Sequence, residues 1–552
     1  MSTTPRLRAH RSLTATAALL PLLFAVGCSG SSTSSGSAQS GSAAPTQNGV
    51  AAGSAAVKSG GTMTVALAED PDKLDPTLGR SLVGREVFAN FCQKLYDINQ
   101  NLQIVPQLAA ALPQTSADGK TVTIKIRSGV KFNDGTTMDA AAVKTTLDRD
   151  KHLSGSARAT EIKPVTSVSV VDPTTVALHL SKPFAPLTAA LADRAGMIMS
   201  PAQLAKLGAN FSTDPICVGP FSFQSRVTGS EIVLTKAPDY YDAAKVKLDK
   251  IVFKIITDGN VRLANLKSGD VNVAERLAPT DVAQIRSDAN LRLITATSIG
   301  YQGITINVGN ANGITKPVGA INTALGRSPQ LRQAFADTLD RNVINKVVFA
   351  GEYLPTCSPI PDASPFNTHQ PCPGPDVAAA KKLVAASGVP TPIPVQMTIG
   401  TAPEQLRFGQ VVQTLAKQAG FDVQLKPTEF ASSLDQTDAG KFDTFQIGWS
   451  GRVDPDGDIY NFMHTGGTLN IAGLSDPAID QPLDAARTSS DQATRAKDYA
   501  AALSAQAAKN GLIYLYREQL FLGTAKNVTG LAYYDDGLPR LETAGFTAGS
   551  GG

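Results

Sequence analysis

Apolar and polar positions follow two different periods along the chain after residue 60. At 63–67 and 122–126, apolar residues occupy every second position, which is the period of a strand with one buried face. Apolar-rich runs at 232–236 and 251–256 predict two further strands. The segments between such runs have helical spacing instead, and we find no repeat of solenoid length. The pattern therefore predicts a mixed α/β protein.

Helix starts are marked by capping residues. Asp139 precedes a run with apolar residues four apart, so it is a candidate N-cap. Ser328 and Pro329 supply a cap and a first-turn proline for a second helix. A third helix is predicted at 376–386, with Gly388 at the position where a left-handed residue ends a helix.

The N-terminus has the features of an export signal. Residues 1–27 hold three arginines and no acid, followed by an apolar run at 13–25. This run is shorter than the roughly 20 residues that span a bilayer, so we predict a cleaved signal. Small residues precede Cys28, and this arrangement resembles a bacterial lipobox, which implies lipidation of Cys28. The alternative is a plain secretory signal with an incidental cysteine.

Composition separates a tether from a globular body. Residues 28–60 are rich in Ser, Gly and Ala with a single charge, so a flexible tether is predicted. The whole chain carries a formal charge of +3. Removing the three signal arginines from the 50 basic residues leaves 47, equal to the 47 acidic residues. That balance excludes a nucleic-acid binder relying on a basic field, and 552 residues indicate two or three domains.

Four cysteines follow Cys28, namely Cys92, Cys217, Cys357 and Cys372. An even number in an exported chain predicts disulfides. Cys357 and Cys372 bracket a short proline-rich loop, where a disulfide would contribute about 3 kcal/mol. Cys92–Cys217 is the remaining pairing and requires two distant segments to meet.

Chemistry typical of enzymes is missing from the sequence. It contains no HExxH, GxSxG, P-loop or GxGxxG motif, and its histidines are scattered. Asp454, Asp456 and Asp458 superficially follow the start of an EF-hand, but Gly457 stands at the wrong position and no Glu occupies position twelve. The sequence therefore indicates no catalytic site and no cofactor.

A series of motifs between residues 60 and 535 carries a family resemblance. In chain order they are PDKLDP (71–76), LY (95–96), PQLA (106–109), DGK (118–120), IRSGVKF (126–132), DG (134–135), PICVGPF (215–221), PDYY (238–241), LKSGD (266–270), LRQAF (331–335), DR (340–341), GW (448–449) and DPD (454–456). Their order and spacing resemble the bacterial extracellular solute-binding proteins of family 5, the dipeptide-, oligopeptide- and nickel-binding lipoproteins of ABC importers.

The resemblance implies an α/β fold of the two-lobe, class II periplasmic-binding-protein type with an extra subdomain in the first lobe. Two strands near 299–306 and 521–528 would cross between the lobes as a hinge. The implied divisions are a signal at 1–27, a tether at 28–60, a first lobe at 61–300 with its subdomain at 93–205, a second lobe at 301–525 and a return to the first lobe at 526–552.

The loop after Trp449 departs from the family pattern. Peptide-binding members carry Asp three residues after this Trp, where it pairs with the peptide ammonium, but Arg452 stands here. Arginine cannot accept a hydrogen bond, whereas it suits a carboxylate or phosphate. An ammonium ligand would then need Asp454 or another acid. The alternative for Arg452 is a structural ion pair with Asp454 or Asp456. The alternative for Trp449 is that it packs in the core rather than lining the cleft.

The resemblance implies a function and its partners. The chain would be a non-enzymatic substrate-binding lipoprotein, a monomer held at the outer face of the cytoplasmic membrane. It would capture a peptide or similar small solute in a cleft and deliver it to ABC permease subunits. A cysteine at 217 is unusual for the family, which favours its pairing with Cys92. Two alternatives are a carrier of a metal or haem chelate, with His464 as the candidate ligand, and a secreted hydrolase.

Overall fold

The computed structural model describes residues 46–47 and 57–547. The predicted signal at 1–27, Cys28 and most of the predicted tether lie outside the described residues. The structure differs from the predicted flexible tether at its end, where β2 (Val57–Lys58) pairs with β25 (Gly545–Thr547). Pairing of this kind uses backbone groups and needs no apolar side chains, which is why composition missed it.

The predicted strands and helices form where the pattern placed them. The strands are β3 (Thr62–Leu67), β7 (Thr121–Lys125), β11 (Glu231–Lys236) and β12 (Lys250–Ile255). The helices are α2 (Ala140–His152), α8 (Pro329–Thr338) and α10 (Val377–Ala386). Asp139 accepts a hydrogen bond from the Ala142 N–H at 2.9 Å, so the predicted cap is confirmed.

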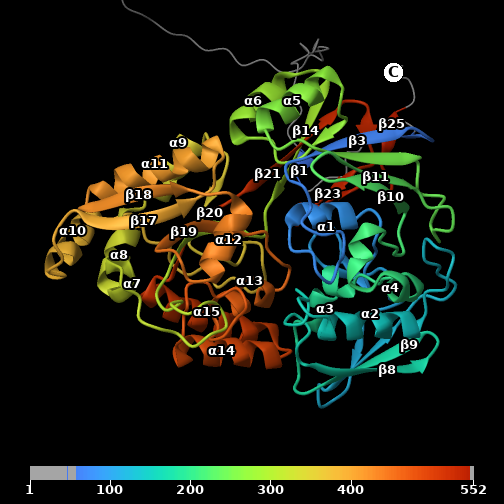
Figure 1. Ribbon diagram of the computed structural model, residues 1–552, viewed down its shortest axis with the longest axis horizontal. Coiled ribbons are helices and arrows are strands. Elements are labelled where there is room, and N and C mark those ends of the chain that lie inside the picture. The colour runs from blue at the N-terminus through green and yellow to red at the C-terminus, as the bar shows by residue number, and fades with distance from the viewer. Residues whose placement is uncertain (1–45, 48–56, 548–552) are drawn as a thin grey trace, which may run out of the picture. The chain divides into compact units, whose positions relative to one another are not determined.

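The first lobe is built on an eight-stranded sheet (Figure 1). Its order is β1 (Thr46–Gln47), β14 (Leu291–Thr297), β21 (Gln519–Ala525), β13 (Val273–Ala274), β3, β12, β11 and β10 (Phe221–Val227). Buried residues of α5 (Gly259–Ser268) and α6 (Val282–Ser287) join the core on one face. Those of α1 (Leu82–Phe88) join the core on the other face.

A four-stranded sheet forms a separate core within the first lobe. Its order is β6 (Gln114–Thr115), β7, β9 (Thr175–Leu180) and β8 (Val165–Asp172), and α2 contributes to the same core. The smaller elements of this lobe are β4 (Tyr96–Ile98), β5 (Ile104–Pro106), α3 (Leu187–Ala190), the 3₁₀ helices η1 (Arg194–Gly196), η2 (Gly208–Thr213) and η3 (Pro279–Asp281), α4 (Pro201–Leu207), β22 (Val528–Thr529), β23 (Ala532–Tyr533) and β24 (Pro539–Arg540).

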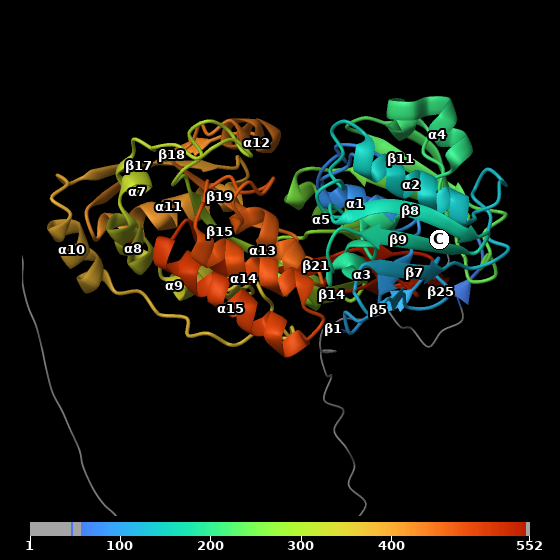
Figure 2. The same cartoon turned by 90° about the horizontal axis from the view of Figure 1, so that it is seen from below.

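The second lobe is a six-stranded sheet between two layers of helices. The sheet order is β16 (Leu354–Pro355), β20 (Leu512–Arg517), β15 (Tyr301–Ile306), β19 (Thr444–Trp449), β17 (Ile393–Ile399) and β18 (Phe421–Pro427). One face packs on α13 (Asp456–Met463), α14 (Pro477–Thr488) and α15 (Gln492–Lys509), as Figure 2 shows. The other packs on α8, α9 (Arg341–Val348) and α11 (Pro403–Lys417), and the lobe also holds α7 (Ala324–Arg327), α10 and α12 (Phe430–Asp438).

The chain crosses between the two sheets twice. β14 leads through residues 298–300 into β15, and β20 leads through Glu518 into β21. The Ser298 N–H donates to the Glu518 carbonyl at 2.9 Å, so the crossings are adjacent. The second crossing comes before the predicted 521–528, and β21 belongs to the first sheet. The polar residues Arg517, Glu518 and Gln519 separate the apolar runs of β20 and β21 and mark the crossing, and the predicted position lay a few residues too late.

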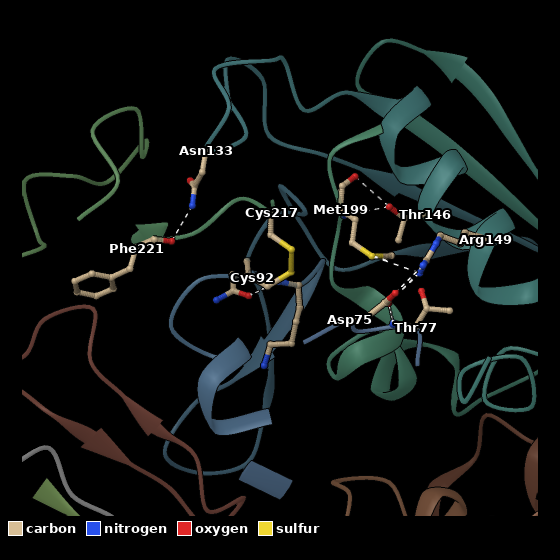
Figure 3. The surroundings of a disulfide bond; sticks show 11 residues. Asp75, Thr77, Cys92, Asn133, Thr146, Arg149, Met199, Cys217 and Phe221 are labelled. Carbon is tan, nitrogen blue, oxygen red and sulfur yellow. Dashed lines mark hydrogen bonds and ion pairs between the residues drawn. A yellow bond between two sulfur atoms is a disulfide. The ribbon is translucent and has the colours of Figure 1, made fainter. Parts of the chain in front are cut away.

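Both predicted disulfides are present. Cys92, just after α1, bonds to the buried Cys217 (Figure 3), and Cys357 bonds to Cys372. Beside the first of these, Arg149 of α2 donates to both carboxylate oxygens of Asp75, at 2.9 and 2.6 Å (Figure 3). The ion pair joins α2 of the subdomain to the segment after β3, and the disulfide joins the chain segments that enter and leave the subdomain. Of the described helices, none combines the length and the apolar character needed to cross a bilayer.

The two disulfides should differ in their contribution to stability. Cys92 and Cys217 are 125 residues apart, whereas Cys357 and Cys372 are separated by 15. In the chain-entropy model, the longer loop contributes about 5 kcal/mol and the shorter about 3 kcal/mol. We therefore expect the double variant C92A/C217A to unfold at lower urea concentration than C357A/C372A. Equal unfolding midpoints would contradict this ranking.

Candidate ligand site around Trp449 and Arg452

The loop that carries Arg452 packs directly against the first crossing. β19 ends at Trp449, opposite Tyr301 of β15. Gly451 follows with φ 81°, and a Cβ there would lie 2.4 Å from the Gly300 nitrogen. A Cβ on Gly300 would in turn lie 1.9 Å from the Trp449 carbonyl oxygen. Only glycine fits at these two positions, and the loop is therefore held at the boundary between the lobes.

Trp449 is half-buried, not enclosed in the core. Its ring meets Phe462 edge-on at 5.0 Å between centroids, and the Arg452 guanidinium carbon lies 4.5 Å from its centroid. The indole N–H is buried and has no hydrogen-bond partner among the described residues. A buried donor of this kind normally finds an acceptor, so Trp449 combines a stacking face with an unused polar group.

Arg452 connects the two lobes. Its Nε lies 2.7 Å from Oδ2 of Asp193, which precedes η1 in the first lobe. Its Nη1 donates to the Gly451 carbonyl at 2.7 Å, and its backbone N–H donates to Asp458 at 2.7 Å. The Nη2 atom is buried without a partner among the described residues. The alternative expectation is an ion pair of Arg452 with Asp454 or Asp456. Arg452 does form an ion pair, but its partner is Asp193.

Asp193 is the shared acceptor of two arginines. Arg85 of α1 donates its Nε–H to the other carboxylate oxygen, Oδ1, at 3.1 Å. Burial acts to raise the pKa of Asp193, but Arg85, Arg452 and then Arg194 outweigh it and hold that pKa well below its usual range. Burial also lowers the pKa of Arg452, which Asp193 partly offsets. The carboxylate is therefore ionised, and each of its two oxygens lies beside one arginine.

Four guanidinium groups gather here with too few carboxylates to neutralise them. We call Arg85, Arg158, Arg194 and Arg452 the arginine cluster; its ion-paired acids are Asp193 and Glu161, the latter 2.5 Å from Arg158. Two more buried acids lie nearby, Asp150 beside Arg158 and Asp458 beside Arg452, but burial raises the pKa of both above their usual range, so they supply less negative charge. Each arginine keeps one buried nitrogen with no partner among the described residues: Arg85 Nη1, Arg158 Nε, Arg194 Nε and Arg452 Nη2. Buried charge that is neither paired nor hydrogen-bonded is costly, and an anionic group would relieve that cost.

Asp454 and Asp456 are committed to structural ion pairs. Asp454 Oδ1 lies 2.7 Å from Arg495 Nη2, and the Asp456 carboxylate accepts two bonds from Arg487, at 2.7 and 2.9 Å. All four side chains are almost completely buried. These pairs anchor the loop and α13 onto α14 and α15, which leaves Asp454 poorly placed to receive a ligand ammonium group.

His464 has ordinary surroundings. Its Nδ1 lies 2.8 Å from the Thr465 carbonyl, its Nε2 lies 3.5 Å from Asp484, and its ring stacks on Tyr460. Across residues 46–47 and 57–547, no group of three or more His, Cys, Asp or Glu side chains is arranged to hold a metal ion. No observation here separately favours the metal-chelate alternative.

Sequence reasoning singled out Trp449 and Arg452 as candidates but not the other three arginines of the cluster. Asp193 and Arg194 stand in an ordinary loop, and Arg85 lies in a short helix without a motif. They come together only because α1, η1 and the loop after β19 meet in three dimensions. The one usable signal was the exchange of the family's acid for Arg452, which implied a change in local charge.

Comparison with known proteins now gives the class of protein. Residues 103–470 match the family model described as bacterial extracellular solute-binding proteins, family 5, middle. This match covers more than half of the chain, so the protein belongs to that family. Members of the family are transport binding proteins, not enzymes, and their two-lobe fold is the fold seen here.

Three individual proteins show how similar this chain is to members with a described ligand. The chain is 29% identical over 85% of its length to the glutathione-binding protein GsiB of Salmonella paratyphi A, covering 91% of that protein. The structure of AgaA from A. tumefaciens R10 in complex with agropinic acid is 27% identical, with a TM-score of 0.78 over 88% of this chain and 99% of that one. The oligopeptide-binding protein AppA of Bacillus subtilis, solved with a nonapeptide, has a TM-score of 0.79 at 21% identity over 89% and 100% of the two chains.

Proposed function

We propose that the protein captures a small carboxylate-bearing solute, peptide-like or an anionic conjugate, between its lobes for an ABC importer. The observation that carries this proposal is the arginine cluster, where buried guanidinium nitrogens lack partners among the described residues and the cationic excess is local. A carboxylate can accept two parallel bonds from one guanidinium, which suits Arg452 and Arg85. The similarity to a protein named for glutathione binding and to one solved in complex with agropinic acid supports a solute of this size.

The mechanism follows from where the cluster lies. Arg452 belongs to the second lobe and the other three arginines to the first, so a bound anion contacts both lobes at once. Because only the closed arrangement gains both sets of contacts, the solute shifts the equilibrium toward closure. Permease subunits in the membrane would then recognise the closed form, and lipidated Cys28 would hold a monomeric protein beside them.

The direct test uses the intrinsic fluorescence of Trp449, which is the single tryptophan of the chain. Glutathione, short peptides and sugar-acid conjugates are titrated into protein that has been unfolded and refolded to remove retained solute. We expect at least one carboxylate-bearing solute to change the emission and raise the melting temperature. Native mass spectrometry of protein that was never unfolded identifies the solute it retains. No response across the panel and no retained mass would overturn the proposal.

The anchor is tested separately. A Cys28→Ala variant should leave the membrane fraction and fail to incorporate labelled palmitate, while its solute affinity stays unchanged. Labelling of the variant, or its retention in the membrane fraction, would contradict lipidation at Cys28.

A further inference from the structure

A second charged group, of opposite sign, lies where the lobes join. We call its five members the hinge carboxylates: Glu69 after β3, Glu86 of α1, Glu275 after β13, Glu404 of α11 and Glu518 at the second crossing. Burial raises the pKa of Glu404 to about 7, and Glu518 adds to that effect. Carboxylates raise one another's pKa only when they lie close together, so this group is electrostatically crowded.

Arg276 is the one cation in direct contact with the hinge carboxylates within the described part of the chain. Its Nη1 lies 3.6 Å from Glu69 Oε1. Although burial opposes it, attraction to Glu69, Glu518 and Glu275 raises the pKa of Arg276 further. Its backbone has φ 47°, a left-handed conformation that a non-glycine residue adopts only when its surroundings impose it. Arg276 therefore acts on all five carboxylates, whereas Arg85, Arg262 and Arg407 each act on only some of them.

Nearby Arg262 adds positive charge beside Glu275 and opposes the rise that burial causes in the pKa of that carboxyl, but its guanidinium is held by the backbone. It donates to four backbone carbonyls, those of Glu275, Ile256, Thr257 and Arg276. Its hydrogen-bonding capacity is therefore spent on the backbone, and no ion pair joins its guanidinium to a hinge carboxylate among the described residues.

Two of the hinge carboxylates are buried with an unused oxygen. Glu86 is 1% exposed and Glu275 is fully buried, and Oε2 of each has no hydrogen-bond partner among the described residues. Burial, then the nearby Glu275 charge, raises the pKa of Glu86 well above its usual range. Glu275 Oε1 accepts from the Ala68 N–H at 2.5 Å, so its Oε2 is the free atom. A raised pKa means that Glu86 holds a proton in the empty protein, and a cationic group bound beside these two oxygens would take the place of that proton.

The two charged groups are adjacent. Arg85 of the arginine cluster and Glu86 of the hinge carboxylates are consecutive residues of α1, with Cα atoms about 3.8 Å apart. Each group also includes one residue from the second lobe, Arg452 and Glu404 respectively. A small solute lying across this part of α1 could therefore place an anionic group on one side and a cationic group on the other.

We propose that the hinge carboxylates form a subsite for an ammonium or guanidinium group, so that the solute is a zwitterion whose cationic end binds beside Arg276 while its carboxylate binds the arginine cluster. This inference rests on the proposed function, since it names the charge pattern of the same solute. It also relocates cation recognition from the loop after Trp449, where Arg452 repels a cation, to the junction of the lobes.

The first test needs no ligand. If the hinge carboxylates await a cation, removing one charge from the empty protein relieves repulsion, so Glu404→Gln should raise the melting temperature at pH 8 by about 2 °C. Glu404 faces Glu518, Asp281, Arg276 and Arg407. Its pKa of about 7 exceeds the unfolded value near 4.3, so wild type loses stability as pH rises through that interval and the Gln variant does not. The two proteins should therefore melt together at pH 4.

Two further variants keep this test decisive. Glu518→Gln removes a second charge of the group at a different element and should shift the melting temperature in the same direction. Glu352→Gln is the matched control, because Glu352 also lies in the second lobe and reaches the first through Arg286 at 3.4 Å, outside the group. Glu352→Gln should not raise the melting temperature at pH 8. A lower melting temperature in both Glu404→Gln and Glu518→Gln would mean that these acids stabilise the empty hinge, and would overturn the proposal.

The second test compares matched solutes by Trp449 fluorescence. Reduced glutathione and the dipeptide Met-Leu each carry an ammonium group, and their N-acetylated forms keep the carboxylates but lose that charge. Wild type should bind the free-amine member of a pair about tenfold or more tightly than the acetylated member. Glu404→Gln should reduce this preference, whereas Glu352→Gln should keep it.

The outcomes separate the two proposals. Equal binding of free and acetylated members by wild type would overturn the cation subsite while leaving carboxylate capture intact. If wild type binds no member of either pair, carboxylate capture fails for peptide-like solutes, and the melting comparison then decides on the hinge carboxylates alone.

Discussion

Replacing Asp456 with alanine is expected to lower the free energy of unfolding by about 3–5 kcal/mol. The Asp456 carboxylate accepts two bonds from Arg487, and both side chains are less than a tenth exposed. Burial raises the pKa of Asp456, and Arg487 is the main group opposing that rise. Without the carboxylate, a guanidinium stays buried with no counter-charge, and it lies 3.2 Å from the centroid of the Tyr460 ring, where water cannot easily reach it.

The measurement is urea unfolding followed by far-UV circular dichroism. Asp148→Ala is the matched control, because it removes the same side chain from an ion pair with Lys144 that is more than a third exposed. Asp148→Ala should lower the free energy of unfolding by less than about 1 kcal/mol. If the two variants unfold at the same urea concentration, the buried pair does not anchor α13 as described.

Local elements of this fold could be predicted because their signals are local. The helix after Ser328 begins with a side chain that caps its own first turn, with Ser328 Oγ 3.2 Å from the Leu331 nitrogen. In β3 the alternation reports which residues face the core, since Met63 and Val65 are fully buried. In both cases the interaction that forms the element lies within a few residues of the pattern that predicts it.

The position of the hinge and the partners of Arg452 could not be predicted in that way. Glu518 lies in a short polar break between two apolar runs, but a polar break alone does not show that β20 and β21 belong to different sheets. Arg452 had acids nearby in sequence at Asp454 and Asp456, yet it pairs with Asp193, far away in the chain. The closer acids are taken by Arg487 and Arg495 of helices α14 and α15, whose packing no sequence pattern reveals.

Charge selection in this protein is therefore a property of two small regions. The globular part of the sequence is formally balanced, so no long-range field distinguishes one small solute from another. The arginine cluster and the hinge carboxylates each carry a local excess instead. Arg85, Arg158 and Arg194 of the first group and Glu86 and Glu275 of the second are shielded from solvent, where charges interact more strongly than at the surface.

The largest effect on binding is expected from Arg452→Ala. A buried charge-assisted contact to a carboxylate is worth about 2–5 kcal/mol when one partner is truncated, so affinity for a carboxylate-bearing solute should fall by about 100-fold or more. Two contributions are lost together: the donors offered to the solute, and the 2.7 Å contact with Asp193 that holds the lobes together.

Two companion variants separate these contributions. Arg452→Lys keeps the charge but not the planar fork that stacks on Trp449, so it should recover only part of the affinity. Asp193→Asn removes the contact between the lobes while leaving the Arg452 donors in place. If Arg452 acts only by joining the lobes, Asp193→Asn and Arg452→Ala should weaken binding equally. Binding of the carboxylate predicts a larger loss for Arg452→Ala.

Titration by intrinsic fluorescence and by calorimetry measures these affinities, with calorimetry needed because Arg452 lies against the fluorophore. Arg327→Ala is the control, since Arg327 is an exposed arginine of the second lobe that bonds only to the Asn322 carbonyl through its side chain among the described residues. It should bind as wild type does. Wild-type affinity in Arg452→Ala would show that the carboxylate is recognised elsewhere, because no other arginine of the cluster belongs to the second lobe and could restore a contact with both lobes.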